Sequence, residues 1–328
     1  MAVGKPLKIN TMTVTELIHN ARRPLFTFEL LPPLKGHSID RIYTAIDRLI
    51  DFAPAYINFT THANETVLVE RGDGLLEKRV VRKRPGTVAL AAAVKYKYNV
   101  TVVPHVLCGG FTREETENML IEMNFLGIND VLALRGDPPR GSRVFIPEKN
   151  GHSYTSELVS QIAAMNRGEY LDSTLREPVP TSFCIGVAGY PEKHFEAPNM
   201  ATDLANLKRK VDAGASYIVT QMFFDNTHFF RFRDAVAAAG ITVPVIPGIK
   251  PVSALNDLSL LPQTFHIDLP ETLVHELRKC TTDEQVRKTG IEWATAQSRE
   301  LLGAGVPGIH YYTLGRSDNV ARIVKGSY

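Results

Sequence analysis

The chain alternates between short apolar runs with strand character and longer segments whose apolar residues recur at helical spacing. The strand-like runs span residues 25–30, 55–60, 100–107, 130–134, 182–188, 217–223, 243–249 and 309–314. The helical segments span residues 13–21, 39–52, 88–98, 112–125, 158–165, 201–213, 227–239 and 252–303, the last with a polar break near 281–283. Eight strands alternating with helices predict an α/β fold, a (β/α)8 TIM barrel with a short N-terminal helix. An open doubly wound sheet is the alternative, although no GxGxxG follows an early strand.

Local signals sharpen some of these boundaries. Thr112 with Glu115 three residues later has the spacing of a capping box, so a helix should begin there. Residues 61–75 are polar and predict a loop, and residues 166–180 look like an excursion from the regular pattern. The basic stretch at 78–84, KRVVRKR, predicts a solvated helix or loop.

Composition narrows the class of partner. The 328 residues are 44% hydrophobic and carry a net charge of only +2, which favours neither nucleic acid nor an anionic membrane as a partner. Three cysteines that are far apart in sequence indicate no disulfide framework and no structural metal site. With no run of eighteen apolar residues and no apolar leader, the sequence predicts a cytoplasmic protein.

Polar side chains stand where the predicted strands end. The clearest case is the stretch at 130–139, DVLALRGDPP, in which an apolar strand runs into Arg135, Gly136 and Asp137 before two prolines. In a barrel, the carboxyl ends of the strands line the active site. The candidates found in this way are Glu29, Thr60, His105, Arg135, Asp137, Tyr190, His194, Gln221 and Arg316.

Glu29 is the candidate with the most specific chemistry. It stands among Phe26, Phe28 and Leu30, and a carboxylate in apolar surroundings is costly unless it is paired or protonated. Desolvation should therefore raise its pKa, as suits a general acid. From spacing alone the sequence predicts a barrel enzyme with a carboxylic acid at its mouth, and no particular substrate.

Seven motifs in the chain resemble those of the methylenetetrahydrofolate reductase family, and they occur in the family's order. They are FTFELLPP at 26–33, LALRGDPP at 132–139, IGVAGYPEKHFEA at 185–197, DLANLKRKVDAGA at 203–215, IVTQMFFD at 218–225, PVIPGIKPV at 244–252 and HYYTLGR at 310–316. The resemblance implies reduction of 5,10-methylenetetrahydrofolate to 5-methyltetrahydrofolate by a nicotinamide nucleotide. It also implies a single catalytic barrel over residues 1–328 with no C-terminal regulatory domain, and leaves the oligomeric state open.

The resemblance also assigns roles to individual residues. Glu29 matches the general acid that opens the folate ring to a 5-iminium cation before hydride addition. Asp137 matches the aspartate that contacts the pterin, Gln221 the pterin-binding glutamine, and Arg316 a residue on the folate and nicotinamide side. The contacts that a flavin makes in the family match Thr60, His105, Arg135, Gly136, Tyr190, His194, Asp203, Asn206, Arg209 and Lys210.

Whether FAD or FMN is used here is a separate question. The tyrosine and glycine-rich loop that the family has after the second strand is replaced by bulkier residues at 61–65, and Leu107 and Leu261 also depart from the pattern. These departures favour direct hydride transfer to the folate without a flavin. NADH is preferred over NADPH, because no run of arginines suited to an additional phosphate is present.

Two other functions fit the same fold. A flavin-dependent amino-acid dehydrogenase acting on proline-like substrates would use the same kind of barrel. A folate-binding protein without turnover would keep the pocket, but it would have no need of an acid such as Glu29.

Overall fold

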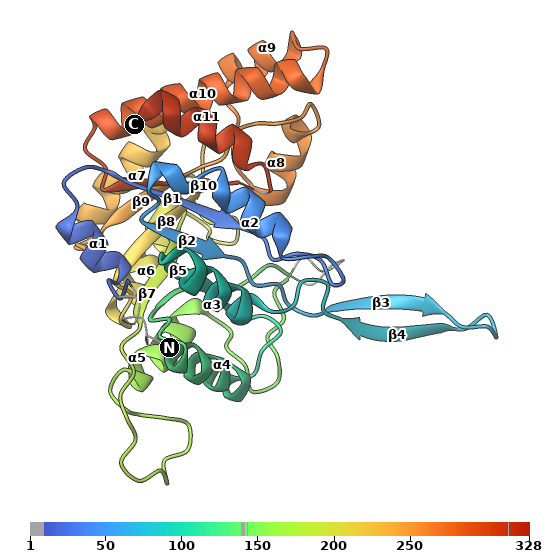
Figure 1. Ribbon diagram of the computed structural model, residues 1–328, viewed down its shortest axis with the longest axis vertical. Coiled ribbons are helices and arrows are strands. Elements are labelled where there is room, and N and C mark those ends of the chain that lie inside the picture. The colour runs from blue at the N-terminus through green and yellow to red at the C-terminus, as the bar shows by residue number, and fades with distance from the viewer. Residues whose placement is uncertain (1–9, 139–141, 143, 314) are drawn as a thin grey trace, which may run out of the picture.

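The computed structural model describes residues 10–138, 142, 144–313 and 315–328, and its centre is a closed barrel of eight parallel strands (Figure 1). Around the barrel the strands follow the order β1-β10-β9-β8-β7-β6-β5-β2. Their bounds are β1 (Leu25–Leu30), β2 (Tyr56–Phe59), β5 (Thr101–Leu107), β6 (Asp130–Leu134), β7 (Cys184–Gly189), β8 (Tyr217–Met222), β9 (Val245–Ile249) and β10 (Gly308–Tyr312). The predicted barrel is confirmed, and each predicted strand lies within two residues of an observed one.

Helices surround the barrel. They are α1 (Val14–Asn20), α2 (Asp40–Asp47), the 3-10 turn η1 (Ile50–Phe52), α3 (Thr87–Tyr98), α4 (Arg113–Phe125), α5 (Thr155–Met165), α6 (Met200–Asp212), α7 (Asn226–Ala238), α8 (Asp257–Phe265), α9 (Glu271–Arg278), α10 (Asp283–Gly303) and α11 (Ser317–Ser327). The predicted capping box is present, since the Thr112 hydroxyl accepts from the Glu115 amide while the Glu115 carboxylate accepts from the Thr112 amide. Helix α11 was not predicted. No helix of the described residues is both long enough and apolar enough to cross a membrane.

The pleat of each strand divides its side chains between two cores. In β1, Phe26, Phe28 and Leu30 pack outward in the large cluster between the barrel and its helices. Thr27 and Glu29, which alternate with them, point into the barrel instead. A second cluster fills the barrel near the amino ends of its strands and includes Tyr56 and Tyr217.

The predicted loop at 61–75 is wrong at residues 65–70, which form a strand, while 61–64 and 71–75 are loop and turn as predicted. Residues Glu65–Glu70 and Leu76–Val81 form an antiparallel hairpin, β3 and β4, which projects from the barrel on the side opposite α1 (Figure 1). The basic stretch at 78–84, predicted to be helix or loop, begins in β4. Asp73-Gly74 between two runs of β-branched residues was the missed signal, because this dipeptide favours a tight hairpin turn.

The excursion at 166–180 is confirmed as an irregular segment without helix or strand. Its two ends are held together, because the Tyr170 hydroxyl donates to the Val179 carbonyl at 2.7 Å. Asn166 also anchors the return of the chain to the barrel by accepting from the Phe183 amide at 2.7 Å.

Candidate active site

Glu29 lies inside the barrel near the carboxyl ends of the strands. It is paired in register with Asn58 of β2 on one side and Tyr312 of β10 on the other. Its side chain is 9% exposed, and its Oε2 lies 3.4 Å from Nε2 of His105 and 4.0 Å from Nε2 of His310. The Thr313 hydroxyl, which follows β10, donates to the Glu29 carbonyl at 2.7 Å.

The structure corrects the expected direction of the Glu29 pKa. Burial is the largest influence and raises it, but the interactions with His310, His105 and His62 together outweigh burial and hold the pKa below its usual 4.5. The reason is strand alternation: the aromatic neighbours in sequence point to the outer core, and the carboxyl group meets imidazoles inside the barrel. In the protein without ligands, Glu29 is therefore ionised at neutral pH.

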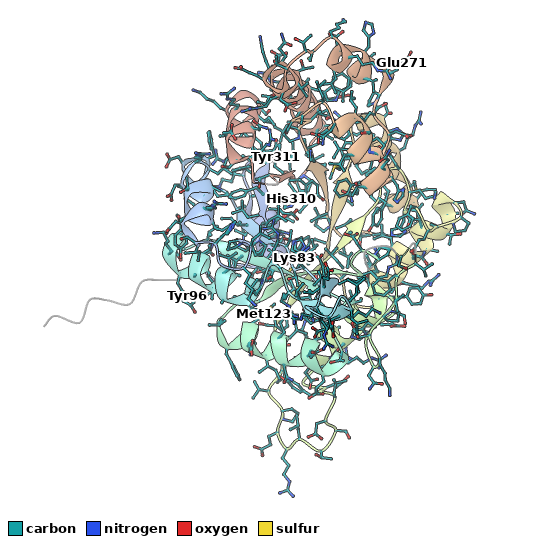
Figure 2. The ribbon with its side chains drawn as sticks, turned by 90° about the vertical axis from the view of Figure 1, so that its right-hand side faces the viewer. Lys83, Tyr96, Met123, Glu271, His310 and Tyr311 are labelled. Atoms are coloured by element: carbon teal, nitrogen blue, oxygen red, sulfur yellow. The ribbon has the colours of Figure 1, made fainter. Side chains whose placement is uncertain are left out.

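The two histidines beside Glu29 are themselves held by neighbouring strands. Burial lowers the pKa of His105 to about 4, so this ring is neutral at physiological pH. Its Nε2 lies 3.3 Å from the amide nitrogen of Asn58. His310 bonds the Thr27 hydroxyl through Nδ1 at 2.9 Å. His310 faces Glu29 inside the barrel, whereas its neighbour Tyr311 packs in the outer core; both are labelled in Figure 2.

His62 connects the buried acid to the more exposed side of the site. Its Nε2 lies 3.2 Å from the Thr60 hydroxyl. Burial and the Arg84 charge lower its pKa, while the negative charges of Glu29 and Asp137 oppose this shift. Asp137 is exposed, whereas Glu29 is buried. The two carboxyl groups therefore act on the His62 imidazole from different sides, one solvated and one buried.

Gln221 stands at an irregularity in the sheet. The pairing of β8 with β9 shifts between Val219 and Met222, which places Gln221 in a bulge at the end of β8. The half-buried side chain of Gln221 accepts from the Met222 amide at 2.9 Å. Beside it, the Tyr312 hydroxyl donates to the Thr220 carbonyl at 2.6 Å.

Arg135 is engaged by protein groups. Its guanidinium pairs with the Glu196 carboxylate at 2.5 Å and lies over the Phe145 ring, 4.9 Å from the ring centroid. The neighbouring Gly136 has a φ of +87°, which a residue with a side chain adopts only with strain. The chain therefore turns sharply after β6, and the charge of Arg135 is already balanced by Glu196.

The remaining predicted cofactor residues form a cluster after β7. The rings of Tyr190 and His194 meet edge to face at 4.6 Å, and the His194 amide donates to the Asp203 carboxylate at 2.9 Å. Lys210 donates to the Ala188 carbonyl at 2.7 Å, and burial lowers the pKa of Lys210 to about 8.

Arg209 and Lys210, which both match flavin contacts of the family, point in different directions. Lys210 turns toward β7, whereas Arg209 is exposed on α6. Consecutive residues on a helix do not share a face, so the two cations do not converge on one phosphate. Asn206, one turn earlier, is half-buried.

Arg316 lies at the rim of a cavity of about 310 Å3 next to the ends of β9 and β10. Its guanidinium donates to the Ser253 carbonyl at 3.4 Å. Tyr312 and Thr313 also line this cavity, and Thr313 bonds the Glu29 backbone. Arg316 and Glu29 are therefore linked through one strand end.

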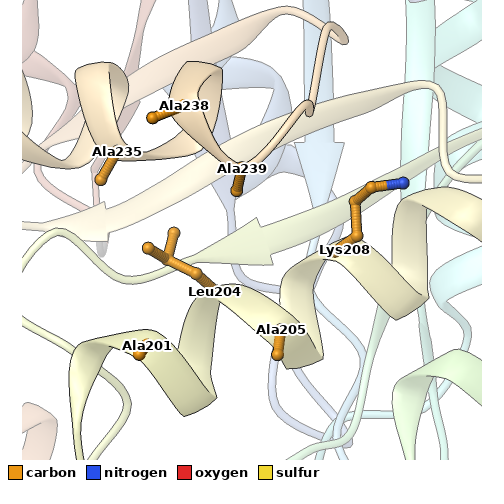
Figure 3. A pocket seen from close by; sticks show the side chains of 7 residues that line it. All are labelled: Ala201, Leu204, Ala205, Lys208, Ala235, Ala238 and Ala239. Atoms are coloured by element: carbon orange, nitrogen blue, oxygen red, sulfur yellow. The ribbon is translucent and has the colours of Figure 1, made fainter.

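A wider groove of about 490 Å3 lies elsewhere, between α6 and α7 (Figure 3). Its walls are alanines, Leu204 and the aliphatic part of Lys208. Its lining has no carboxyl group and no histidine, and it lies on the outer helices instead of the strand ends, so it lacks the chemistry proposed for the barrel mouth.

Sequence reasoning missed several polar groups of the barrel mouth. Asn58, His62, His310 and Tyr312 all lie near Glu29 but were not singled out. The available signal was alternation, since Asn58 and His310 are the polar residues between outward-facing apolar ones. Among the described residues, no group of three or more histidine, cysteine, aspartate or glutamate side chains is arranged to hold a metal ion.

Comparison with known proteins identifies relatives. Residues 14–327 match the family model described as methylenetetrahydrofolate reductase. The Arabidopsis thaliana "Methylenetetrahydrofolate reductase (NADH) 1" is 32% identical over 299 residues, covering 88% of this chain and 46% of that protein. The "5,10-methylenetetrahydrofolate reductase" of Escherichia coli (strain K12) is 32% identical over 293 residues, covering 89% of this chain and 86% of that protein.

The chain thus spans about half the length of the plant and yeast relatives and most of the length of the bacterial ones. Among solved structures, an uncharacterized protein from Clostridium thermocellum that binds two copies of 5-methyl-5,6,7,8-tetrahydrofolic acid superimposes with a TM-score of 0.58. It is 13% identical and covers 95% of this chain and 96% of that one, so this likeness concerns the fold.

Proposed function

The chain belongs to the methylenetetrahydrofolate reductase family, and from this premise we propose that it reduces 5,10-methylenetetrahydrofolate to 5-methyltetrahydrofolate with NAD(P)H. One proton and one hydride are added to the folate, and the nicotinamide is oxidised. The observation that carries the proposal is the buried carboxyl group of Glu29, held by His105 and His310 inside the barrel mouth.

In this mechanism Glu29 donates a proton to N10 of the bridged folate. The bond between N10 and the methylene carbon breaks, and a 5-iminium cation forms. Hydride from the nicotinamide then adds to the methylene carbon. A cation of this kind is stabilised by nearby carboxylates, which are Asp137 and the newly ionised Glu29.

Glu29 must gain its proton as the ligands bind, because it is ionised in the unliganded protein. Burial is already the largest influence on its pKa and favours the neutral form. A pterin that covers the mouth removes water and strengthens this influence, so the pKa rises toward the range of a useful acid.

Gln221 and Arg316 complete the substrate side of the proposal. The amide of Gln221 can donate and accept at once, which matches the edge of a pterin. Arg316 lies at the rim of the adjacent cavity, where it can meet an anionic part of the folate or of the nicotinamide nucleotide. All these residues come from the barrel and its loops, so we propose that the barrel acts as one catalytic unit.

We further propose that NADH delivers hydride directly, without a flavin. Two of the residues that would hold a flavin already have partners within the protein: Arg135 pairs with Glu196 and lies over Phe145, and Lys210 donates to the Ala188 carbonyl. His62 occupies the side of the site where the family has a glycine-rich loop, and the following residue, Ala63, packs against Gly110. These side chains do not fit the flavin site that the resemblance implies.

The test of the cofactor proposal is an absorbance spectrum of freshly purified protein. We expect no flavin band and full turnover without added FAD or FMN. A flavin band in near-stoichiometric amount, bleached by NADH, would contradict direct transfer while leaving the folate reaction intact.

The test of the reaction itself is NADH oxidation under anaerobic conditions with identification of 5-methyltetrahydrofolate as product. A proline-like substrate run in parallel separates this function from that of an amino-acid dehydrogenase. Binding of folate without NADH oxidation would favour the folate-binding alternative.

A further inference from the structure

The hairpin β3–β4 projects from the barrel and holds apolar side chains in solvent (Figure 1). Leu68 is 61% exposed, Leu76 63% and Val80 70%. The three side chains share one face of the hairpin, because Leu68 pairs with Lys78, and Leu76 and Val80 lie two residues to either side of Lys78 in β4. A two-stranded hairpin is marginally stable in water unless further strands or a covering element complete its sheet.

The two edges of this hairpin differ in charge. Among the described residues the sheet contains only β3 and β4, so each strand has an open edge. The edge of β4 carries Lys78 and Arg79 and continues into the cations of 82–84, and charges on an edge strand oppose pairing with a further strand. The centre of β3 at 66–69 reads TVLV, an uncharged run with high β propensity. The edge suited to pairing is therefore that of β3.

The turn of the hairpin shows which backbone groups of β3 face this edge. The Arg71 amide donates to the Leu75 carbonyl at 2.8 Å, and the Arg71 carbonyl accepts from the Gly74 amide at 2.9 Å. Both backbone groups of Arg71 therefore point toward β4. Because successive residues of a strand direct these groups to opposite edges, the amides and carbonyls of Leu68 and Glu70 point to the open side.

The sequence of β3 is complementary to a second copy of itself in an antiparallel register centred on Leu68. In this register Leu68 lies opposite Leu68 of the second copy, and Val67 lies opposite Val69. The two ends carry opposite charges, so Glu65 lies opposite Arg71 at each end of the pair. Apolar β-branched pairs and opposite charges stabilise directly opposed strands.

We propose that the protein forms a two-fold symmetric dimer in which the β3 edges of two copies pair antiparallel and join the hairpins into one four-stranded sheet. Because the hairpin projects away from the barrel, the two barrels lie at opposite ends of this sheet (Figure 1). Its outer strands are the two copies of β4, whose Lys78 and Arg79 oppose further addition, so assembly ends at the dimer. One strand from each copy makes a small interface, so the dimer is reversible and depends on protein concentration.

The first test is a cross-link across the two-fold axis. In the proposed register the two Leu68 residues form a hydrogen-bonded pair with Cα atoms about 5.5 Å apart, which a disulfide can span. Leu68→Cys, oxidised by dioxygen with a copper catalyst, should therefore give a covalent dimer on a non-reducing gel. Val80→Cys is the matched control, because Val80 is comparably exposed on the same face but lies on the outer strand, far from its counterpart. The wild type is run alongside because it contains three free cysteines.

The second test is the oligomeric state in solution, measured by sedimentation velocity over a range of concentrations. The wild type should pass from monomer to dimer as its concentration rises. Leu68→Lys places two like charges opposite each other at the axis, so dimerisation should weaken about tenfold or more. Val80→Lys adds the same charge on the outer strand and should dimerise like the wild type. A Tm equal to that of the wild type in both variants shows that the fold is intact.

Two kinds of result would overturn the inference. A wild type that sediments as a monomer up to millimolar subunit concentration rules out the dimer, whatever the gels show. A dimer that survives Leu68→Lys, or that cross-links through Val80→Cys and not through Leu68→Cys, uses another surface and contradicts the β3 register. Neither test requires turnover, so a failure of the proposed folate reaction leaves both results decisive.

Discussion

The two ends of the barrel each bury a carboxyl group, but in opposite states. At the amino end, Asp130 accepts from the Val14 amide of α1 at 2.7 Å and lies near the hydroxyls of Tyr56 and Tyr217. Burial raises the pKa of Asp130 to about 7. At the mouth, the histidines around Glu29 overcome burial and lower its pKa.

This comparison shows that the partners of a buried acid decide its charge. The groups around Asp130, which include the Lys95 cation and the Glu16 carboxylate, do not offset its burial, so its charged form is disfavoured and the amino end serves to seal the barrel. Glu29 has three imidazoles within its influence, so its charged form is accepted and can exchange a proton when a ligand changes the surroundings. Substitutions at the two ends test this division between a structural end and a chemical end.

The largest effect is expected at the mouth. Glu29→Gln removes the proposed acid while keeping its size, so turnover should fall on the order of a thousandfold, within the usual range for general acid catalysis. Binding of 5-methyltetrahydrofolate, measured by calorimetry, should change little. Asp130→Asn is the matched control at the other end and should retain turnover, whereas unchanged turnover in Glu29→Gln would remove the assigned role.

The next effect concerns stability at the amino end. Because the folded-state pKa of Asp130 is raised from 3.8 to about 7, its contribution to stability is full below pH 3.8 and is lost as pH rises through 7. Asp130→Asn should abolish this decline, a difference of roughly 2 to 4 kcal/mol between pH 4 and pH 8. Urea unfolding of both proteins across this range measures it, and parallel curves would contradict the raised pKa.

The contribution of Glu29 to stability depends on pH with the opposite sign. Its pKa is lowered in the folded state, so its contribution is present above pH 4.5 and is lost as pH falls through the folded-state pKa. The two carboxyl groups therefore limit stability from opposite sides of the pH range.

A smaller effect is expected for substrate recognition at the mouth. Gln221→Ala removes the amide proposed to bind the pterin, so KM for the folate should rise by about tenfold, the value of one or two hydrogen bonds. KM for NADH should stay within a fewfold of the wild type in the same assays. Equal increases for both reactants would instead indicate that the bulge at the end of β8 had been disturbed.

The smallest effect is expected at the cap of α1, which covers the amino end. Thr13 accepts from the Glu16 amide, and the Glu16 carboxylate accepts from the Thr13 amide. Thr13→Ala should cost about 1 kcal/mol of stability, read as a lower Tm, without a change in kinetics. A loss of turnover in this variant would mean that the two ends of the barrel are coupled.

The sequence was most informative where local patterns carry the information. Apolar runs of strand length and helices with clear spacing predicted the barrel, and Thr112 with Glu115 predicted the start of α4. It was less informative where an element has little core of its own, as in the hairpin β3–β4, whose Leu68, Leu76 and Val80 are exposed. Helix α11 was missed because it follows β10, the eighth predicted strand, after which no further element was expected.

For the site, the positions of polar residues at the ends of the predicted strands were enough to identify Glu29, His105, Asp137 and Gln221 as candidates. The charge of Glu29 could not be predicted from its neighbours in the chain, because alternate residues of a strand face different cores. Lys250 and Asp257 likewise can be recognised as an ion pair only when the fold brings the end of β9 next to the start of α8.

The sequence by itself determined the barrel, the family and part of the set of polar residues at its strand ends, since these depend on periodicity and on motifs that are local. Only the tertiary structure decided which of those residues meet, and therefore which are ionised, which are already paired and which remain available to a ligand. The physical reason is that charge states and hydrogen bonds depend on neighbours in space, and closing the barrel brings together His310 and Glu29, which are distant in the chain.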